Sequence, residues 1–246
     1  MSERSTRPPL IVAIDGPAGA GKSTVARALA RRFGLLNLES GAMYRAFALK
    51  AIQAGVPTRD AAALEVLAHT TEVRLEPDTD GNRVLLDGAD ITSQLRTPQI
   101  TAAASEVSVH PPIRRWLVGL QKILGAQGNV VMEGRDIGTV VFPHAPVKIF
   151  LDASPEKRGE RRYEQNRGDE QNRDEKGGVA VTTQLPATVL EEIRERDRRD
   201  RTRADSPLRP AADATIIDST DLTLDEVIER ASALVDGYLR EIGTRE

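Results

Sequence analysis

The chain has 246 residues, 39% of them hydrophobic and 29% charged, and it carries a formal net charge of −3. This slightly acidic balance argues against a dedicated nucleic-acid binder, which usually carries a basic excess, and no apolar run approaches the roughly 20 residues that cross a bilayer. Cysteine is absent, which excludes disulfides, thiolate zinc sites and thiol nucleophiles. We therefore expect a cytoplasmic protein without nucleic-acid or membrane partners, built from one α/β domain or from a core domain with an insert.

The chain opens with a polar segment, residues 1–9, which contains a Pro-Pro pair and which we expect to be a disordered tail. Leu10–Ile14 is a short apolar run typical of a buried parallel strand. Lys22–Phe33 has the spacing of an amphipathic helix, which Gly34 ends. Between this strand and this helix lies the pattern G-x-x-x-x-G-K-[ST], which indicates a phosphate-binding loop (P-loop).

The P-loop and the start of its helix comprise nine consecutive residues: Gly16, Pro17, Ala18, Gly19, Ala20, Gly21, Lys22, Ser23 and Thr24. Glycines allow successive backbone N–H groups to curl around phosphate oxygens, and the helix points its positive end at the same anion. Lys22 is expected to reach the β- and γ-phosphates of ATP, and the Ser23 hydroxyl to ligate Mg²⁺. A chance match in a Gly/Ala-rich turn is the alternative, but the flanking strand and helix are the context that the motif needs.

A bound triphosphate does not by itself identify an enzyme. A GTPase-type switch usually reads guanine with an Asn-Lys-x-Asp segment, and the chain contains no Asn-Lys pair. The length of the chain disfavours an ATPase motor. A small-molecule kinase fits better, and such an enzyme needs cations that neutralise the repulsion between two phosphorylated substrates.

The other predicted elements follow an order typical of a parallel sheet with helices on both faces. The remaining strands are predicted at Leu35–Leu38, Val130–Met132, Val147–Leu151 and Thr215–Ile217, and further helices at Gly41–Ala54, Ile113–Leu124 and Leu224–Leu239. Glu72–Glu76 and Arg83–Asp87 flank a turn-rich segment and predict a β-hairpin. We expect residues 66–108 to form a small antiparallel insert.

Two segments place charge at the carboxyl ends of strands, where open α/β sheets usually bind ligands. Arg45, one turn after Gly41, can face that edge, although a solvated arginine at a helix start explains it equally well. In Glu133–Thr139, glycines frame Arg135 and Asp136. Arg135 could grip a phosphate with two parallel hydrogen bonds, and Asp136 could accept one from an exocyclic amine. An ordinary turn with a surface ion pair is the less favoured interpretation.

Two strongly charged segments, residues 156–176 and 191–203, precede the last strand. Charge runs are usually solvated helix faces, and the second segment has too few apolar side chains to bury an apolar face. Each segment nevertheless places three side chains on one helix face, and these are Arg158, Arg161 and Arg162 in the first and Arg196, Asp200 and Arg203 in the second. A kinase needs such a flap, because it brings cations to the transferring phosphoryl group and keeps water out. The residues expected to stabilise that group are Lys22, Arg135, Arg158 and Arg162.

Five sequence blocks, taken in order, resemble the bacterial cytidylate kinase family, whose members transfer a phosphoryl group from ATP to CMP or dCMP. The blocks are Ile14–Thr24, Ser40–Arg45, Gly134–Pro143, Val147–Ser154 and Glu195–Asp197, and the resemblance covers almost the whole chain after Pro9. It implies a P-loop NTPase three-layer fold with a five-stranded parallel sheet, an antiparallel monophosphate-binding insert at 66–108 and a mobile helical lid at 156–204. The core would comprise residues 10–65, 109–155 and 205–246.

The resemblance also implies roles for single residues. Three arginines would hold the CMP phosphate, with Ser40 beside them, and these are Arg45, Arg135 and Arg203. The ribose would contact Arg196 and Asp200. The cytosine edge would be read by Ser105, Arg114 and Asp136. Cytosine offers an amine donor next to a ring-nitrogen acceptor, which suits a carboxylate and a hydroxyl on the amine and a guanidinium on the ring nitrogen. Uracil reverses both polarities and would leave buried groups unpaired.

The chain departs from the family pattern in two places. A polar stretch at 168–178 is longer than expected, and its composition predicts disorder. Glu133 stands where an aspartate is more usual, and either carboxylate could orient a Mg²⁺-bound water. We expect a monomer that binds small nucleotides (ATP, CMP and dCMP). Two alternatives stay open, namely a P-loop kinase for another monophosphate or small metabolite and a catalytically silent nucleotide-binding module.

Overall fold

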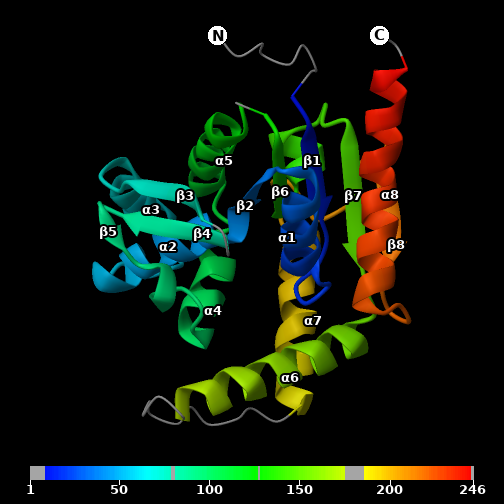
Figure 1. The fold of residues 1–246 in the computed structure, drawn as a ribbon. Helices are drawn as coiled ribbons and strands as arrows, with labels where there is room; N and C mark the ends of the chain where they lie inside the picture. Colours follow the sequence, from blue (N-terminus) through cyan, green and yellow to red (C-terminus); the bar gives the residue numbers. More distant parts are fainter. Residues whose placement is uncertain (1–8, 79–80, 127, 175–185, 245–246) are drawn as a thin grey trace.

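The structure is a computed structural model that describes residues 9–78, 81–126, 128–174 and 186–244. A five-stranded parallel sheet in the order β2-β6-β1-β7-β8 forms its centre (Figure 1). The strands are β1 (Ile11–Asp15), β2 (Leu36–Glu39), β6 (Val130–Gly134), β7 (Val147–Asp152) and β8 (Thr215–Asp218). The predicted α/β class and the five parallel strands are confirmed. The tail predicted at residues 1–9 lies outside the described residues except for Pro9.

Each strand of this sheet ends one or two residues later than predicted, because backbone pairing continues past the apolar run. Asp15 pairs with Gly134, and Glu39 pairs with Glu133. As a result each strand carries a carboxylate at its last or next-to-last position, and these are Asp15, Glu39, Glu133, Asp152 and Asp218. The carboxyl edge of the sheet is therefore a row of acidic side chains.

Helices cover both faces of the sheet and complete three layers. On one face α1 (Lys22–Phe33) and α8 (Leu224–Gly243) share a core with the strands, in which Leu29 and Val235 are fully buried. On the other face, α5 (Pro111–Gly125) and a π-helical turn, η2 (Ile137–Val141), pack on β6 through a second core. Strands buried on both faces read as near-continuous apolar runs, which is why they were recognisable in the sequence.

A second lobe lies beside the central sheet (Figure 1). It holds the antiparallel strands β3 (Val73–Asp78), β4 (Gly81–Leu86) and β5 (Ala89–Asp90), the short helix η1 (Thr92–Gln94), and the helices α2 (Ser40–Gln53), α3 (Ala61–His69) and α4 (Pro98–Val107). The predicted hairpin is confirmed, with Val73 opposite Leu86. Phe47 packs edge-on against Trp116, with ring centroids 5.2 Å apart. The limits 66–108 stay a prediction, because α2, α3 and α5 contribute to the same apolar core.

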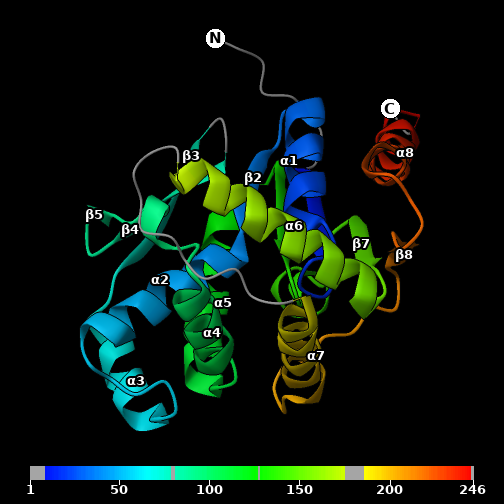
Figure 2. The ribbon, with the colours of Figure 1, turned by 90° about the horizontal axis from the view of Figure 1, so that it is seen from below.

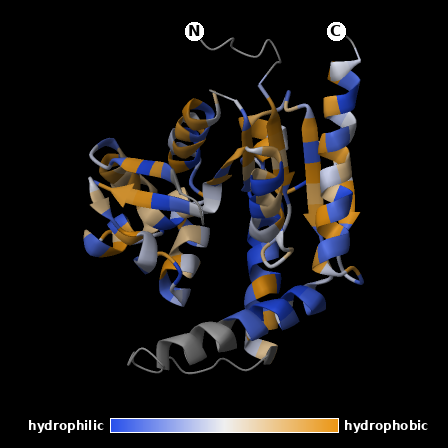
Figure 3. Ribbon diagram, in the orientation of Figure 1, coloured by the Kyte–Doolittle hydropathy of each residue, from blue (hydrophilic) through white to orange (hydrophobic). Residues whose placement is uncertain are grey.

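Two helices, α6 (Pro155–Asp174) and α7 (Pro186–Thr202), lie across the carboxyl edge of the central sheet (Figures 1 and 2). Figure 3 shows that α6 is hydrophilic along its coloured length, whereas the central strands are largely hydrophobic. The predicted disorder at 168–178 is wrong for residues 168–174, which continue α6, and 175–178 lie outside the described residues. Only Glu170, Gln171 and Arg173 of this stretch are strong helix formers, so it extends a helix that the preceding residues have already begun.

Helix α7 buries more of its side chains than its highly charged sequence suggests. Val189 and Ile193 are buried, and one and two turns later Asp197 and Asp200 are buried as well. The alternative interpretation, a purely solvated face, does not hold, because the buried carboxylates meet arginines from other elements. In the part of the chain that the structure describes, no helix combines the length and the apolar character needed to cross a membrane.

Candidate active site

The P-loop connects the end of β1 to the first turn of α1. Gly19 and Gly21 have positive φ values of 77° and 94°, which a residue with a side chain rarely adopts. At Gly16 a Cβ atom would lie 1.9 Å from the carbonyl oxygen of Leu151, so only glycine fits there. The loop therefore packs its backbone closely against β7 and leaves its N–H groups at the amino end of α1, where an anion is stabilised.

Lys22 opens α1 and is buried, with its Nζ 2.7 Å from the carbonyl oxygen of Pro17. Burial, together with the neighbouring Arg135 cation, lowers the pKa of Lys22 to about 7. An anion placed next to Lys22 would stabilise the charged ammonium again. The P-loop lysine is therefore held in a site that favours a phosphate.

Oxygen ligands lie beside the P-loop. The Ser23 hydroxyl donates to Glu133 Oε1 at 2.5 Å. Glu133 is buried, and burial together with the adjacent Glu39 carboxylate raises its pKa. Hydroxyl and carboxylate oxygens are the groups that bind Mg²⁺, directly or through water, so this pair fits the ion that the motif implies. The described residues contain no group of three or more His, Cys, Asp or Glu side chains placed to hold a metal.

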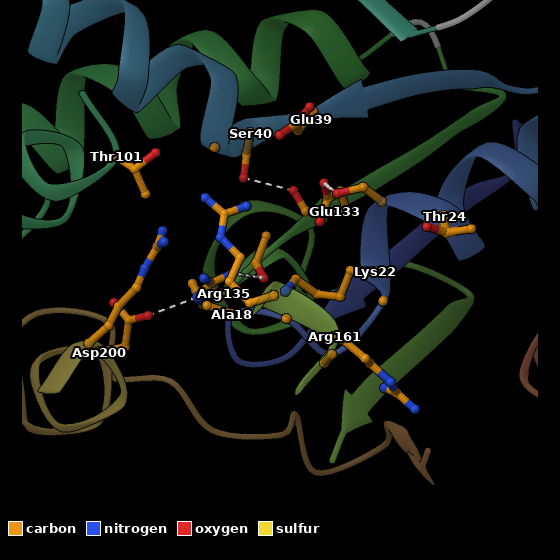
Figure 4. A pocket seen from close by; sticks show the side chains of 18 of the residues that line it. Ala18, Lys22, Thr24, Glu39, Ser40, Thr101, Glu133, Arg135, Arg161 and Asp200 are labelled. Atoms are coloured by element: carbon orange, nitrogen blue, oxygen red, sulfur yellow. Dashed lines mark hydrogen bonds and ion pairs between the residues drawn. The ribbon is translucent and has the colours of Figure 1, made fainter. Parts of the chain in front are cut away.

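Cations gather opposite this oxygen pair. Arg45 pairs with Glu39, and Arg135 Nε lies 2.8 Å from Asp200 Oδ2. Arg196 is mostly buried, and its Nε has no hydrogen-bond partner among the described residues. Burial and the nearby Arg135 cation lower the pKa of Arg196 to about 10. Figure 4 shows Lys22 and Arg135 next to each other between Glu133 and Asp200. So much positive charge in one place favours binding of an anion.

A second polar group lies farther along the cleft. Arg114 is fully buried, forms an ion pair with Asp136 and lies 5.9 Å from the ring centroid of Tyr44. Arg203 bridges this pair to the cation cluster, 3.9 Å from Asp136 and 3.8 Å from Asp200. Ser40 reaches the backbone of β6, with its Oγ 2.8 Å from the carbonyl oxygen of Glu133. A buried donor, Arg114, and a buried acceptor, Asp136, thus lie side by side.

Asp15 fixes the loop that carries Arg135 and Asp136. Its two carboxylate oxygens each accept a backbone N–H at 2.7 Å, from Ile137 and from Gly138. Burial raises the pKa of Asp15 to about 6, against the lowering effect of these hydrogen bonds. The end of β1 therefore holds both the P-loop and the start of η2, so that the two halves of the cleft share one support.

One cavity of about 950 Å³ unites these groups. Most of the residues predicted to form the site line it, and these are Ala18, Gly19, Ala20, Gly21, Lys22, Ser23, Thr24, Ser40, Arg45, Ser105, Arg114, Arg135, Asp136, Arg162, Arg196, Asp200 and Arg203. Gly16 and Pro17 belong to the base of the P-loop. Ser105 Oγ lies 3.3 Å from Arg199 Nη1, so a residue of α7 reaches across the cleft to α4.

Arg158 does not line this cavity, contrary to the prediction that it acts directly on the transferring phosphoryl group. It is 1% exposed, and its guanidinium donates to the carbonyl oxygens of Ala18 and Ala153 and to the carboxylate of Asp197. The charge-run pattern could not distinguish this inward orientation from a solvated one, since its partners lie far away in the sequence.

One end of the cavity, beyond the P-loop, was not predicted from the sequence, although Arg161 was placed on a charged helix face. This end is lined by Arg161, Ser219, Leu222, Leu224 and Val227. Arg161 donates to Ser219 through Nη1, 3.0 Å from Oγ, and through Nη2, 2.6 Å from the carbonyl oxygen. The available signal was the polar Asp218-Ser219-Thr220 segment at the carboxyl end of the last strand, the same edge that the other site residues occupy.

Comparison with known proteins assigns the family. The family model described as cytidylate kinase matches residues 12–236. The cytidylate kinase of Pelotomaculum thermopropionicum is 49% identical over 231 residues, which cover 94% of this chain and 97% of the relative. The cytidylate kinase of Solibacter usitatus is 48% identical with 92% of each chain covered, and that of Nocardia farcinica is 45% identical with 92% of this chain and 94% of the relative covered. The chain, with its P-loop and its buried arginine and aspartate pairs in one cavity, belongs to the cytidylate kinase family.

Proposed function

We propose that this protein transfers the γ-phosphoryl group of Mg²⁺-bound ATP directly to the phosphate of CMP or dCMP. An oxygen of the acceptor phosphate attacks the γ-phosphorus, the bond from that phosphorus to the β–γ bridging oxygen breaks, and ADP leaves with CDP or dCDP as the product. The observation that carries the proposal is the single cavity that joins the P-loop to a buried Arg114–Asp136 pair. Phosphoryl transfer of this kind needs positioning and charge neutralisation rather than a covalent intermediate.

The P-loop is proposed to hold the donor. Its backbone N–H groups and the amino end of α1 face the phosphates, and Lys22 supplies a cation next to the γ-phosphoryl group. The Ser23 hydroxyl and, through water, Glu133 would hold Mg²⁺, which neutralises charge on the β- and γ-phosphates when bound. The end of the cavity formed by Arg161, Ser219 and the neighbouring leucines is proposed for the adenosine.

The acceptor phosphate is proposed to lie against Arg45 and Arg135, where the cations gather. Arg203 completes this set from the end of α7, and the Ser40 hydroxyl lies beside it. Asp200 contacts Arg135 on one side and lies 3.8 Å from Arg203 on the other, so it stands between the cation cluster and the Arg114–Asp136 pair. This position suits the ribose, which links the phosphate of a nucleotide to its base.

The base is proposed to lie at the Arg114–Asp136 pair, with Ser105 nearby. A carboxylate accepts from the exocyclic amine of cytosine, and a guanidinium donates to the adjacent ring nitrogen. Asp136 and Arg114 are 5% and 2% exposed, so a base with the reversed polarity would leave buried charged groups unpaired. Uracil has that reversed polarity and is therefore the expected poor acceptor.

Helices α6 and α7 are proposed to close over both substrates. Arg162 of α6 and Arg196 of α7 line the cavity from this side. Cations brought in by closure stabilise charge on the transferring phosphoryl group, and exclusion of water prevents hydrolysis of ATP.

The test is direct observation of transfer. Phosphorus NMR of the enzyme with Mg²⁺-ATP and CMP or dCMP should show ADP and the nucleoside diphosphate forming in equal amounts. Lys22→Ala should lower kcat at least about 100-fold, as removal of one transition-state donor does. Lys50→Ala is the matched control, because Lys50 pairs with Asp87 outside the cavity and should leave kcat unchanged. ADP formed with inorganic phosphate instead of a diphosphate, or full activity of Lys22→Ala, would contradict the proposal.

A further inference from the structure

Arg158 connects three separate parts of the molecule. It stands in the first turn of α6 and is 1% exposed. Its Nε lies 2.9 Å from the carbonyl oxygen of Ala153, at the end of the sheet, and its Nη1 lies 3.0 Å from the carbonyl oxygen of Ala18, in the P-loop. Nη1 and Nη2 also lie 3.1 Å and 2.5 Å from the two carboxylate oxygens of Asp197 in α7.

The contact with the P-loop bears on how the loop presents its N–H groups. In a trans peptide the C=O and the following N–H point in opposite directions, and none of the described peptide bonds is cis. Arg158 draws the Ala18 carbonyl toward itself, so the N–H of Gly19 points away from Arg158. Gly19 also packs tightly on α6, since a Cβ there would lie 3.1 Å from Arg158 Cβ. A shift of Arg158 would therefore turn this peptide of the P-loop.

The contact with α7 bears on the acceptor site. In the same helix, Asp197 lies between Arg196 and Asp200, and both of these residues line the cavity. Asp200, less than one turn beyond Asp197, holds Arg135. A planar guanidinium with two parallel hydrogen bonds to a carboxylate allows little change in geometry. The position of α7 is thus tied to the same side chain as the Ala18 peptide.

We propose that Arg158 and Asp197 are a pair of positioning residues that links the ATP site to the CMP site. When the P-loop closes on a triphosphate, the Ala18 peptide and Arg158 move together, and Asp197 transmits the change to Arg196 and Asp200. The proposal rests on the function stated above. It predicts that each substrate changes the affinity of the enzyme for the other. Because binding linkage is reciprocal, the factor is the same in both directions.

The test compares the dissociation constant of CMP with and without a non-hydrolysable ATP analogue and Mg²⁺, using calorimetry on the full-length enzyme. For the wild type the two constants should differ at least about 5-fold, the lower end of common coupling factors. In Asp197→Asn the ratio should fall to within about 2-fold of one and kcat should fall at least about 10-fold, because a neutral amide cannot hold the guanidinium in the same way. Arg158→Lys, which keeps the charge but not the fork, should lose the coupling as well.

The matched control is Glu156→Gln. Glu156 and Arg194 form an ion pair at 2.8 Å between the same two helices, but both side chains are more than half exposed and neither lines the cavity. This variant should keep the wild-type ratio and kcat. Urea unfolding identifies the folded variants, and Arg158→Lys serves if Asp197→Asn does not fold.

Three results would overturn the inference: a wild-type ratio of one, a wild-type ratio in the folded variants, or an equal loss of coupling in Glu156→Gln. The wild-type measurement decides the first of these without any variant. Failure of the proposed function would look different, since the enzyme would then form no CDP at any ratio of the two dissociation constants.

Discussion

Buried charge defines this site at the scale of single residues. Asp136, Asp200 and Asp197 are each buried, and each meets an arginine from another part of the chain. Removing one partner of such a pair leaves an uncompensated charge, which costs several kcal/mol, whereas the intact pair contributes little net stability. The pairs are therefore better explained as devices that orient donors and acceptors than as a source of stability.

Arg203 provides a test of the acceptor side. Arg203→Ala should raise the KM for CMP at least about 10-fold, because hydrogen bonds to charged groups contribute roughly 1.5–3 kcal/mol, and it should leave the KM for ATP within about 2-fold. Arg201→Ala is the control, since Arg201 is half-exposed and lies outside the cavity. Its ion pair with Asp152 is long, at 3.8 Å. Steady-state kinetics with each substrate varied decides. An effect confined to ATP would remove Arg203 from the acceptor site.

Asp15 makes a pH-dependent contribution to stability. Burial raises its pKa from the ordinary 3.8 to about 6, so between these values the native state binds more protons at this group than the unfolded state does. Its contribution is complete below about pH 4 and is lost as the pH rises through 6. The wild type should therefore lose up to about 3 kcal/mol of stability relative to Asp15→Asn between pH 4 and pH 7. Urea unfolding of both proteins over this range measures this loss. The free energy of unfolding of the wild type minus that of Asp15→Asn should fall as the pH rises, and a value that stays constant or rises contradicts the prediction.

At the scale of elements, the cleft depends on helices that have well-defined starts. Helix α8 begins with a capping box, in which the Thr223 side chain accepts from the backbone of Glu226 and the Glu226 side chain accepts from the backbone of Thr223. This helix packs on α1, which carries the P-loop at its amino end. Its cap therefore supports the frame of the proposed donor site, although Thr223 itself does not line the cavity.

Thr223→Ala should lower the free energy of unfolding by about 1 kcal/mol, the usual cost of removing an N-cap side chain. The KM values for ATP and CMP should not change, because Thr223 does not line the cavity. Thermal unfolding and steady-state assays on the same preparation separate the two effects. A loss of activity without a loss of stability would show that this helix end has a role beyond support.

At the scale of the whole molecule, the features that sequence reasoning recovered were local in origin. The parallel strands are continuous apolar runs, the P-loop is a short motif, and the Arg135–Asp136 loop lies at a strand end, where ligands bind. Most of the residues predicted from these local features line one cavity.

What sequence reasoning did not recover depends on long-range pairing. The ion pair of Arg158 and Asp197 joins residues 39 positions apart, so no helical period reveals that either is buried. The start of the π-helical turn η2 is held by the Asp15 carboxylate, 122 positions before Ile137. The contact of Arg161 with Ser219 spans 58 positions. In each case a charged or polar group has a distant partner, which a reading of neighbouring residues does not supply.

The selectivity for the acceptor base tests the central claim most directly. The ratio of kcat/KM for CMP to that for UMP, measured in a coupled ADP-release assay, should be at least about 100 for the wild type, because a site built to pair with one polarity rejects the other strongly. Asp136→Ala should lower this ratio at least about 10-fold. The account would be contradicted if the wild type used UMP or AMP faster than CMP, or if Asp136→Ala kept the wild-type ratio.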